Sequence, residues 1–388
     1  MSYRQVTELL RRHTHVVELT DDHGVRVAVC PQWQGRVMTS TCGGPEGPSF
    51  GFVNRPFIET GKPDPKFSNY GGEDRLWLSP EGGQFSLWFK PGVEQTPENW
   101  FTPPALNQGA WEVTSRPLDR DCVMDTQMAF QNASASEFEL DVARRVRLLG
   151  AGDFRRFFGE SAAETLGKSG AKMVAYETVN QITNQGAPWT KEQGLVSIWI
   201  LGMFSASPQT AVIMPYKPGP EARLGPVVRS DYFGRIPPER LKLTPQAVLF
   251  KADGGYRAKI GTSQRRARNV LGSIDFAGAV LTLVQFTMPA DPTRHDYLNN
   301  VWEVPQAEPY VGDVANSYND GSSAPGEQPG AFYEIESLSP AVPLETGESL
   351  IHRHRTVHLQ ADLEVLSTFC EEILGVELET VRQEMLAG

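Results

Sequence analysis

The sequence predicts an all-β protein, a large antiparallel β-sandwich with short helices near its two ends. Segments in which apolar and polar residues alternate recur along most of the chain, as in strands that bury one face. Turn-forming residues separate these segments, in a chain that contains 36 glycines and 29 prolines. Helical patterns do not alternate with the strands, which argues against a parallel α/β sheet.

The elements follow in order from these patterns. Residues 3–12 are predicted to form a short helix, and the alternating segment 25–30 is predicted to be a strand that stops at Pro31. Further strands are predicted at 36–40, 84–89, 137–149, 175–182, 196–203, 210–214, 247–250, 279–286, 331–338 and 349–359. A C-terminal helix is expected after Asp362, because apolar residues then recur at helical spacing.

The whole chain, residues 1–388, is predicted to be a single domain. No linker-like segment divides it, and large antiparallel sandwiches reach this size as one unit. The most polar stretch, 317–330, is interpreted as a long loop, because strand patterns resume directly after it. Hydrophobic residues make up 40% of the chain, which is enough for a full core.

Charge and composition exclude several kinds of partner. The net charge of -11 disfavours binding to a nucleic-acid backbone. No segment approaches the ~18 apolar residues of a membrane span, and the N-terminus has no apolar signal core. The four cysteines are scattered, without a Cys-x-x-Cys motif, as in proteins of a reducing compartment. We therefore predict a cytoplasmic protein that binds neither nucleic acid nor membrane.

Three histidines stand at alternate positions of one predicted strand. His352, His354 and His358 would share a face of the strand 349–359, and the intervening arginines would point the other way. Neighbouring imidazoles on one face can converge on a ligand or a divalent metal ion. The alternative is a solvated edge strand that carries these histidines by chance.

Two glutamates stand at alternate positions of the preceding strand. Glu334 and Glu336 would share a face of the strand 331–338, and the two strands could be neighbours in one sheet. Carboxylates that face imidazoles give acid–base pairs, and they are also metal ligands. The alternative is a pair of surface charges on a half-exposed strand.

A dense patch of glycine, charged and aromatic residues spans 69–88. It contains Glu73, Arg75, Trp77 and Trp88. Aromatic surface beside hydrogen-bonding side chains is what a sugar ligand requires, although these tryptophans could equally belong to the core.

A smaller basic patch lies at 256–261. Arg257 and Lys259 would share one strand face and offer a site for an anionic group, unless this face is simply solvated.

Seven short motifs, distributed along most of the chain, resemble motifs of a single protein superfamily. They are 31–37 (PQWQGRV), Asn54-Arg55, Tyr70-Gly71-Gly72, 180–185 (NQITNQ), Asp231-Tyr232-Phe233, 334–340 (EIESLSP) and 344–348 (LETGE). Together they resemble the galactose mutarotase-like superfamily, which includes the aldose 1-epimerases, and they are closest to its members without an assigned reaction. The resemblance implies a β-supersandwich whose concave face accepts a carbohydrate.

The resemblance also implies roles for single residues. Arg55 matches the arginine that holds the sugar, Asp231 the aspartate that binds sugar hydroxyls, and Glu336 the late glutamate that serves as base. Tyr70 and Gln185 stand where the family has histidines.

These replacements remove the expected proton donor. Mutarotation requires a base for the O1 proton and an acid for the ring oxygen, and Gln185 cannot be that acid. We therefore expect His354 or His352, on the strand after Glu336, to supply the proton.

The function expected from the sequence is that of a sugar-active isomerase of aldose 1-epimerase type, with a small-molecule carbohydrate as its partner. The residues expected to bind the substrate are Arg55, Tyr70, Glu73, Arg75, Trp88, Gln185, Asp231 and Glu334. A carbohydrate-binding protein without turnover is one alternative. A metal-dependent sugar isomerase or lyase that uses His352, His354 and His358 is the other, and no cofactor is expected apart from its divalent ion.

Overall fold

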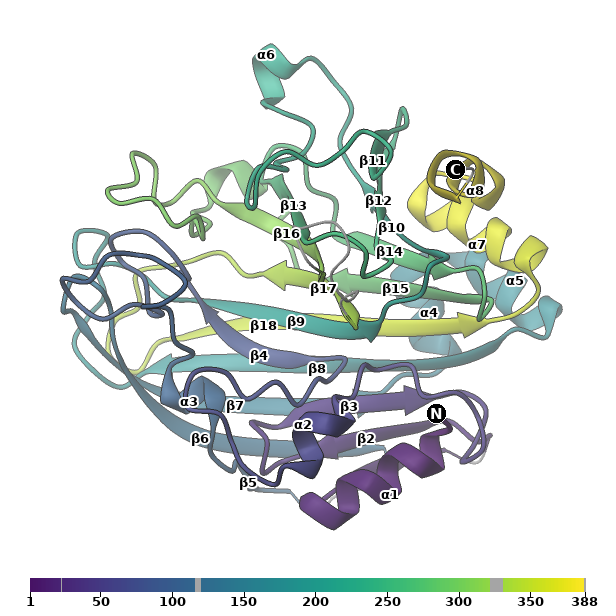
Figure 1. Cartoon of the computed structure of the whole chain (residues 1–388), viewed down its shortest axis with the longest axis horizontal. Helices are drawn as coiled ribbons and strands as arrows, with labels where there is room; N and C mark the ends of the chain where they lie inside the picture. The colour runs from purple at the N-terminus through teal and green to yellow at the C-terminus, as the bar shows by residue number, and fades with distance from the viewer. Residues whose placement is uncertain (22, 116–119, 322–330, 387–388) are drawn as a thin grey trace.

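The computed structural model describes residues 1–388 except 22, 116–119, 322–330 and 387–388. In this part of the chain the strands form antiparallel sheets that pack face to face as a sandwich (Figure 1). The predicted all-β antiparallel architecture is therefore confirmed. Most of the loop predicted at 317–330 lies outside the described residues.

The first layer of the sandwich is a sheet of ten strands, counted over the described residues. In spatial order they are β11 (Leu241–Leu243), β12 (Ala247–Lys251), β10 (Thr210–Pro215), β14 (Val270–Asp275), β15 (Val280–Phe286), β18 (Ser349–Gln360), β8 (Lys172–Asn184), β7 (Glu137–Leu148), β6 (Asp121–Gln131) and β5 (Glu112–Val113). All the pairings are antiparallel.

The second layer consists of two smaller sheets. The first has the order β13 (Ala258–Ser263), β16 (Asp313–Asn319), β17 (Phe332–Leu338), β9 (Ser197–Ser205) and β4 (Arg75–Ser79). The second has the order β1 (Val17–Thr20), β2 (Arg26–Cys30) and β3 (Arg36–Thr41). A bridge between Val37 and Asp74 connects the two sheets edge to edge, and the apolar core lies between this layer and the large sheet.

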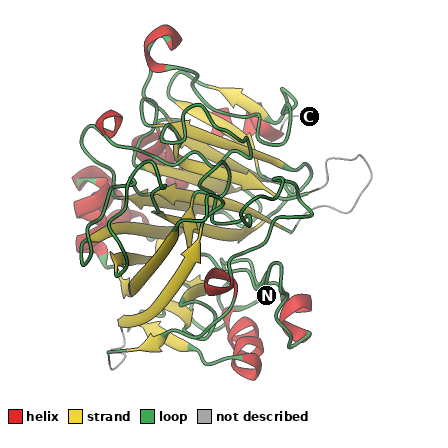
Figure 2. Ribbon diagram, turned by 90° about the vertical axis from the view of Figure 1, so that its left-hand side faces the viewer, coloured by secondary structure: helices red, strands yellow, loops and turns green. Residues whose placement is uncertain are grey.

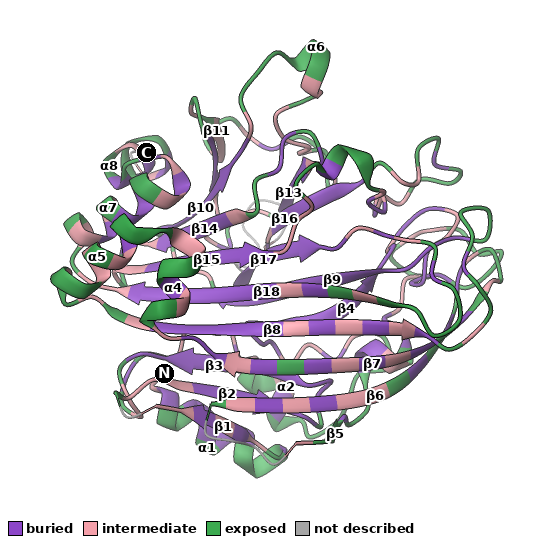
Figure 3. Ribbon diagram, turned by 180° about the vertical axis from the view of Figure 1, so that it is seen from behind, coloured by how far each residue is buried: buried purple, intermediate pink, exposed green. Residues whose placement is uncertain are grey.

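Helices lie outside the strands (Figure 2). They are α1 (Tyr3–His13), α2 (Arg55–Glu59), α3 (Pro104–Asn107), α4 (Ala151–Phe158), α5 (Glu160–Ser169), α6 (Glu221–Leu224), α7 (Leu363–Leu374), α8 (Leu378–Leu386) and a 3-10 turn, η1 (Pro292–Arg294). Viewed from behind, α4, α5, α7 and α8 cover the outer face of the large sheet around β15 and β18 (Figure 3). None of the described helices is long and apolar enough to cross a membrane.

Some sequence predictions are confirmed and others are wrong. The N-terminal helix forms as α1, where Ser2 and Gln5 make a capping box, and the C-terminal helix forms as α7. Residues 84–89 form turns instead of a strand. The helices α4 and α5, between β7 and β8, were not predicted. Each is short and has few apolar residues, so its sequence has no clear helical pattern. These helices are stabilised by packing on the large sheet.

One wrong prediction matters for the function. The strands 331–338 and 349–359 form as β17 and β18, but they belong to different sheets. β17 pairs with β9 and β16, whereas β18 pairs with β8 and β15. The glutamates and histidines on these strands are therefore not neighbours within one sheet.

Candidate functional site

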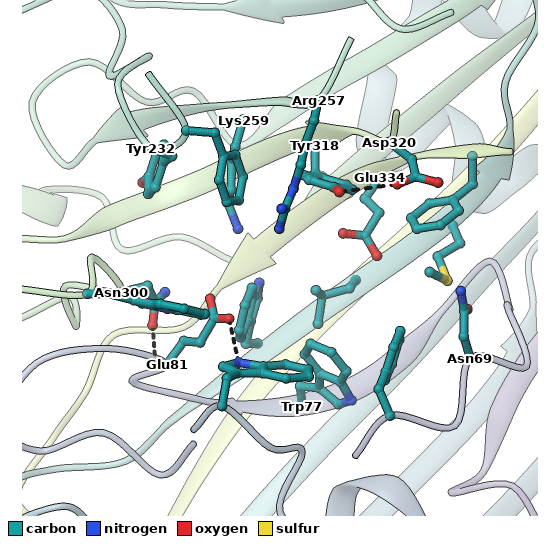
Figure 4. A pocket seen from close by; sticks show the side chains of 18 of the residues that line it. Asn69, Trp77, Glu81, Tyr232, Arg257, Lys259, Asn300, Tyr318, Asp320 and Glu334 are labelled. Carbon is teal, nitrogen blue, oxygen red and sulfur yellow. Dashed lines mark hydrogen bonds between the residues drawn. The ribbon is translucent and has the colours of Figure 1, made fainter. Parts of the chain in front are cut away.

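A cavity of about 630 Å³ lies on the five-stranded sheet (Figure 4). Its lining residue Glu334 and the interior residue Ser337 stand on opposite faces of β17, so the cavity is on the face that points away from the large sheet. Strands β4, β9, β13, β16 and β17 and the loops around them supply the lining residues. The lining residues include Asn69, Arg75, Trp77, Glu81, Trp100, Trp199, Tyr232, Arg257, Lys259, Asn300, Trp302, Tyr318, Asp320 and Glu334. A space of this size is typical of small-molecule sites.

The central strand β17 divides its side chains between the cavity and the sandwich interior. Glu334 lines the cavity, and Glu336 contacts Trp199 and Lys259, which line it as well. Ser337 instead contacts histidines of the large sheet. Successive residues of a strand point to opposite faces, so the prediction that the two glutamates share a face is confirmed.

Glu336 is fully buried beside the cavity, and only one of its oxygens is engaged. Its Oε2 accepts hydrogen bonds from Trp199 Nε1 and from Lys259 Nζ, both at 2.9 Å. Its Oε1 has no hydrogen-bond partner among the described residues. The ammonium of Lys259 also lies 4.8 Å from the ring centre of Trp199. Burial opposes this charge, but Glu336 and Glu81 outweigh burial and raise the pKa of Lys259.

Glu334 stands two residues earlier and has a different partner. Its Oε1 accepts a hydrogen bond from Arg75 Nη2 of β4, and the guanidinium of Arg75 lies 4.1 Å from the ring centre of Trp77. Burial raises the pKa of Glu334 to about 7, which Arg75 opposes and Glu336 reinforces. Arg75 Nε and Nη1 are buried without a partner among the described residues.

The remaining cavity walls combine aromatic rings with fixed polar groups. Trp77 and Trp100 lie on one side, and the indole of Trp100 donates a hydrogen bond to Glu81. Tyr318 and Tyr232 lie on the opposite side (Figure 4). Each phenol donates its own hydrogen bond, Tyr318 to Asp320 and Tyr232 to Asp313. Flat apolar rings between hydrogen-bonding groups match the two kinds of surface of a sugar.

Two glycines just before β4 determine where this strand begins. Gly71 and Gly72 have φ of 87° and 112°, which side-chain-bearing residues rarely adopt. A Cβ at Gly71 would lie 2.2 Å from the backbone oxygen of Phe52. The segments around Phe52 and Gly71 therefore lie in close contact a few residues before Arg75, and this contact fixes where β4 begins.

The histidines of β18 do not reach the cavity. His352 Nε2 and His354 Nδ1 each lie 2.8 Å from Ser337 Oγ, inside the sandwich. Burial lowers the pKa of both imidazoles to about 3, so both are neutral near pH 7. The structure therefore places His352 and His354 on the opposite side of β17 from Glu336, and the expected Glu–His pair does not share a site.

His358 and Glu73 form a separate pair inside the sandwich. His358 Nε2 lies 2.9 Å from Glu73 Oε2, and His358 Nδ1 lies 2.9 Å from Thr282 Oγ1. The prediction that the three histidines share a face is confirmed, but their ring nitrogens contact these separate partners. In the described part of the chain, no group of three His, Cys, Asp or Glu side chains is arranged to hold a metal ion.

Other residues expected at the site lie elsewhere. Arg55 is exposed at the start of α2, where its Nε donates to Glu59 at 2.8 Å. Gln185 is exposed after β8 and donates to Asp141 at 2.6 Å. Asp231 is exposed and does not line the cavity, although the next two residues do. All three residues therefore lie outside the cavity on the five-stranded sheet.

Two aromatic residues expected at the site pack outside the cavity. Tyr70 stacks on Trp33 at 4.2 Å, beside Arg36. Trp88 is fully buried, and its indole donates to the backbone oxygen of Leu78. Trp88 stacks under Trp100, with ring centres 5.5 Å apart. Trp88 therefore supports the ring that faces the cavity without reaching the cavity itself.

Several residues that line the cavity were not among those expected to bind the substrate. Lys259 and Arg257 carried a signal, their alternation on one strand face, and both point into the cavity (Figure 4). Glu81 and Asn300 come from loops, and Asn300 Oδ1 accepts hydrogen bonds from Ser79 Oγ and Glu81 N. Glu81 lies within the patch 69–88, whereas no local pattern in the sequence marked Asn300.

Comparison with solved structures identifies the fold. A proposed aldose 1-epimerase from Escherichia coli K12 is 12% identical, with a TM-score of 0.50, over 89% of this chain and 99% of that chain. A galactose mutarotase-like protein from Lactobacillus casei ATCC 334 is 10% identical, with a TM-score of 0.46, over 89% of this chain and 100% of that chain. The first of these likenesses shows that the protein has the galactose mutarotase-like sandwich fold.

The sequence also matches one family model along nearly its whole length. That model is described as a family of unknown function (DUF6786), and it matches residues 1–385. The chain belongs to this family. No curated protein matches the sequence significantly.

Proposed function

We propose that the protein binds a small carbohydrate in this cavity and interconverts its anomers. The observation that carries the proposal is that Glu334 lines a cavity walled by aromatic rings, while Glu336, on the same face of β17, is hydrogen-bonded to the cavity residues Trp199 and Lys259. Paired carboxylates are suited to proton transfer, and aromatic rings are suited to a sugar face. The aldose 1-epimerase assignment proposed for the Escherichia coli protein of the same fold agrees with this chemistry.

Glu336 is the base in this proposal. Its Oε2 is held by Trp199 and Lys259, which fixes the carboxylate in place. Its Oε1 has a lone pair that no described residue uses, and this oxygen would take the proton of the anomeric hydroxyl. Positioning by two donors removes the need to reorganise the group during the reaction.

The test is the Glu336→Gln variant. The amide keeps the size of the side chain and an acceptor oxygen for Trp199 and Lys259, but it takes up no proton. We expect anomerisation to slow by about 10²–10⁴-fold, the usual contribution of a general base, with sugar binding largely preserved. Polarimetry of a fresh α-anomer measures the rate for a series of hexoses and uronic acids, and calorimetry measures binding.

A matched control separates this effect from a general loss of charge. Glu139→Gln makes the same chemical change at an exposed position of β7, and it should leave the rate unchanged. A Glu336→Gln variant as fast as the wild type would refute Glu336 as the base.

A binding protein without turnover is the second candidate. It is favoured because the groups expected to supply the acid, His352 and His354, lie outside the cavity and are neutral. A sugar that binds in calorimetry while its anomers equilibrate only at the spontaneous rate would establish this candidate in place of the first.

A further inference from the structure

We propose that Glu334 is the proton donor that works with Glu336 as the base. The inference rests on the proposed anomerisation and assigns the acid that His352 and His354, which lie inside the sandwich, do not supply. Glu334 and Glu336 alternate on one face of β17, so they stand about 6–7 Å apart along the strand. Two carboxyl groups at this spacing can act on the two oxygens attached to the anomeric carbon of one bound sugar.

Glu334 is open to the cavity on one side. Its Oε1 is held by Arg75, and its carboxyl group points into the space between the two walls (Figure 4). Its Oε2 makes no hydrogen bond to a described residue and is not closed off by protein. This oxygen is the one that would carry the proton and meet the ring oxygen of the sugar.

The other acidic groups of the cavity are committed to protein partners. The phenols of Tyr232 and Tyr318 donate to Asp313 and Asp320, and the ammonium of Lys259 donates to Glu336. Asp320 also accepts a hydrogen bond from the backbone of Ala331, and Glu81 accepts one from Trp100. Burial raises the pKa of Glu81 as well, but Glu81 stands on the loop after β4 and does not share the strand face that carries Glu336.

The charges around Glu334 are mixed. Arg75 favours its ionised form, whereas burial and the nearby Glu336 favour its protonated form, and the balance brings its pKa to about 7. An acid works best when its pKa lies near the working pH. The charged and titratable groups that face Glu334 are Arg75 on β4, Glu336 on β17, Lys259 on β13, and Tyr318 and Asp320 at the end of β16.

The reaction balances without any further reactant. Glu336 takes the proton of the O1 hydroxyl as the bond between C1 and the ring oxygen breaks, and the ring oxygen takes the proton of Glu334. The open-chain aldehyde then turns about its C1–C2 bond. On closure the ring hydroxyl returns its proton to Glu334 and attacks the other face of C1, while O1 recovers the proton held by Glu336.

The experiment is the pH dependence of kcat/KM for the fastest sugar, in the wild type and in Glu334→Gln. The wild-type rate should fall above about pH 7 as the acid loses its proton. Glu334→Gln keeps an acceptor for Arg75, and it should lose about 10²–10⁴-fold in rate together with this alkaline limb. Glu334→Asp keeps a titrating carboxyl group and should retain a shifted limb, so it serves as the test if the amide variant does not fold.

A second readout needs no turnover. Infrared spectra at about pH 6 should contain the carbonyl band of a protonated carboxylic acid that disappears in Glu334→Gln and persists in Glu139→Gln. A Glu334→Gln variant with the wild-type rate and alkaline limb, or a Glu334 that is already ionised at pH 6, would overturn the assignment while leaving the enzyme in place. A wild type that accelerates no sugar would overturn the proposed function, and the role of Glu334 with it.

Discussion

The two faces of β17 carry different kinds of polar group: carboxyl groups on one face and an uncharged hydroxyl on the other. On the cavity face, Glu334 and Glu336 each pair with a cation and keep one oxygen free. On the interior face, Ser337 connects two neutral imidazoles within the sandwich. One strand thus supplies carboxyl groups to a site and uncharged groups to the core, at alternate positions.

The interior face shows what a buried polar layer requires. The Ser337 hydroxyl has one proton and two lone pairs, so it can donate to one imidazole, which must then be neutral, and accept from the other. Beside them, Arg144 pairs with Asp74 inside the sandwich, and Asn180 and Thr178 add hydrogen bonds to the pair. Groups without access to water must satisfy each other, and this fixes how the two layers align.

The cavity face at β17 also has buried polar atoms that lack hydrogen-bond partners in the described part of the chain. Arg75 Nε, Arg75 Nη1 and Glu336 Oε1 are buried and unpaired among the described residues. Unpaired groups of this kind cost stability in a core. In a binding site they are the groups that a ligand completes. Interior atoms such as His354 Nε2, Arg144 Nε and Glu73 Oε1 are unpaired as well, over the residues that the structure describes. The two faces therefore differ in charge and in their distance from the cavity, and this difference can be tested from either side.

The largest effect is expected from breaking the buried pair. Arg144→Met leaves Asp74 uncompensated, with both side chains fully buried, and it should lower the free energy of unfolding by about 3–5 kcal/mol. Arg145→Met is the matched control, because the next residue of β7 makes a half-exposed pair with Asp121 worth at most about 1 kcal/mol. Urea unfolding measures both variants, and equal losses would contradict the distinction between interior and surface.

The next effect concerns the neutral histidines. Their folded-state pKa values are lowered to about 3, so between about pH 6.5 and pH 3 the unfolded chain binds more protons than the folded one. The free energy of unfolding should therefore decrease as the pH is lowered through this window, by up to about 1.4 kcal/mol per pH unit for each histidine. His354→Asn should make the slope shallower than in the wild type.

Comparison with variants isolates that contribution. Glu334 acts in the opposite direction, because its raised pKa makes the folded state bind the extra proton between about pH 7 and pH 4.5. The slope is therefore read as the difference between His354→Asn and the wild type, and substitution of the exposed His13 provides the control. Identical slopes for His354→Asn and the wild type would show that His354 is not held neutral.

The smallest effect is expected at positions that the motifs favoured and the structure places elsewhere. Arg55→Ala and Gln185→Ala should change the Kd for a bound sugar by less than about twofold, because both side chains are exposed and lie outside the cavity. Trp100→Ala, which removes a cavity wall, should weaken binding by about tenfold, or about 1.4 kcal/mol. Calorimetric titration measures all three, and a large loss in Arg55→Ala would move the site toward α2.

Much of this protein could be predicted from local patterns. Alternation located most strands, because a strand with one buried face repeats every two residues. It failed at 84–89, where an apolar stretch forms turns. The motif around Glu336 identified one residue beside the cavity, and the Arg257–Lys259 alternation marked two of its cations.

The sequence by itself determined which side chains share a face: Glu334 with Glu336 on β17, and His352 with His354 on β18. Only the tertiary structure decided whether those faces meet. β17 and β18 are separated by a short connection, yet β17 pairs with β9 and β16, whereas β18 pairs with β8 and β15. Pairing partners are selected by long-range packing of the two layers, which a period-two pattern does not encode. For this reason the glutamates face the cavity while the histidines lie across β17 in the core.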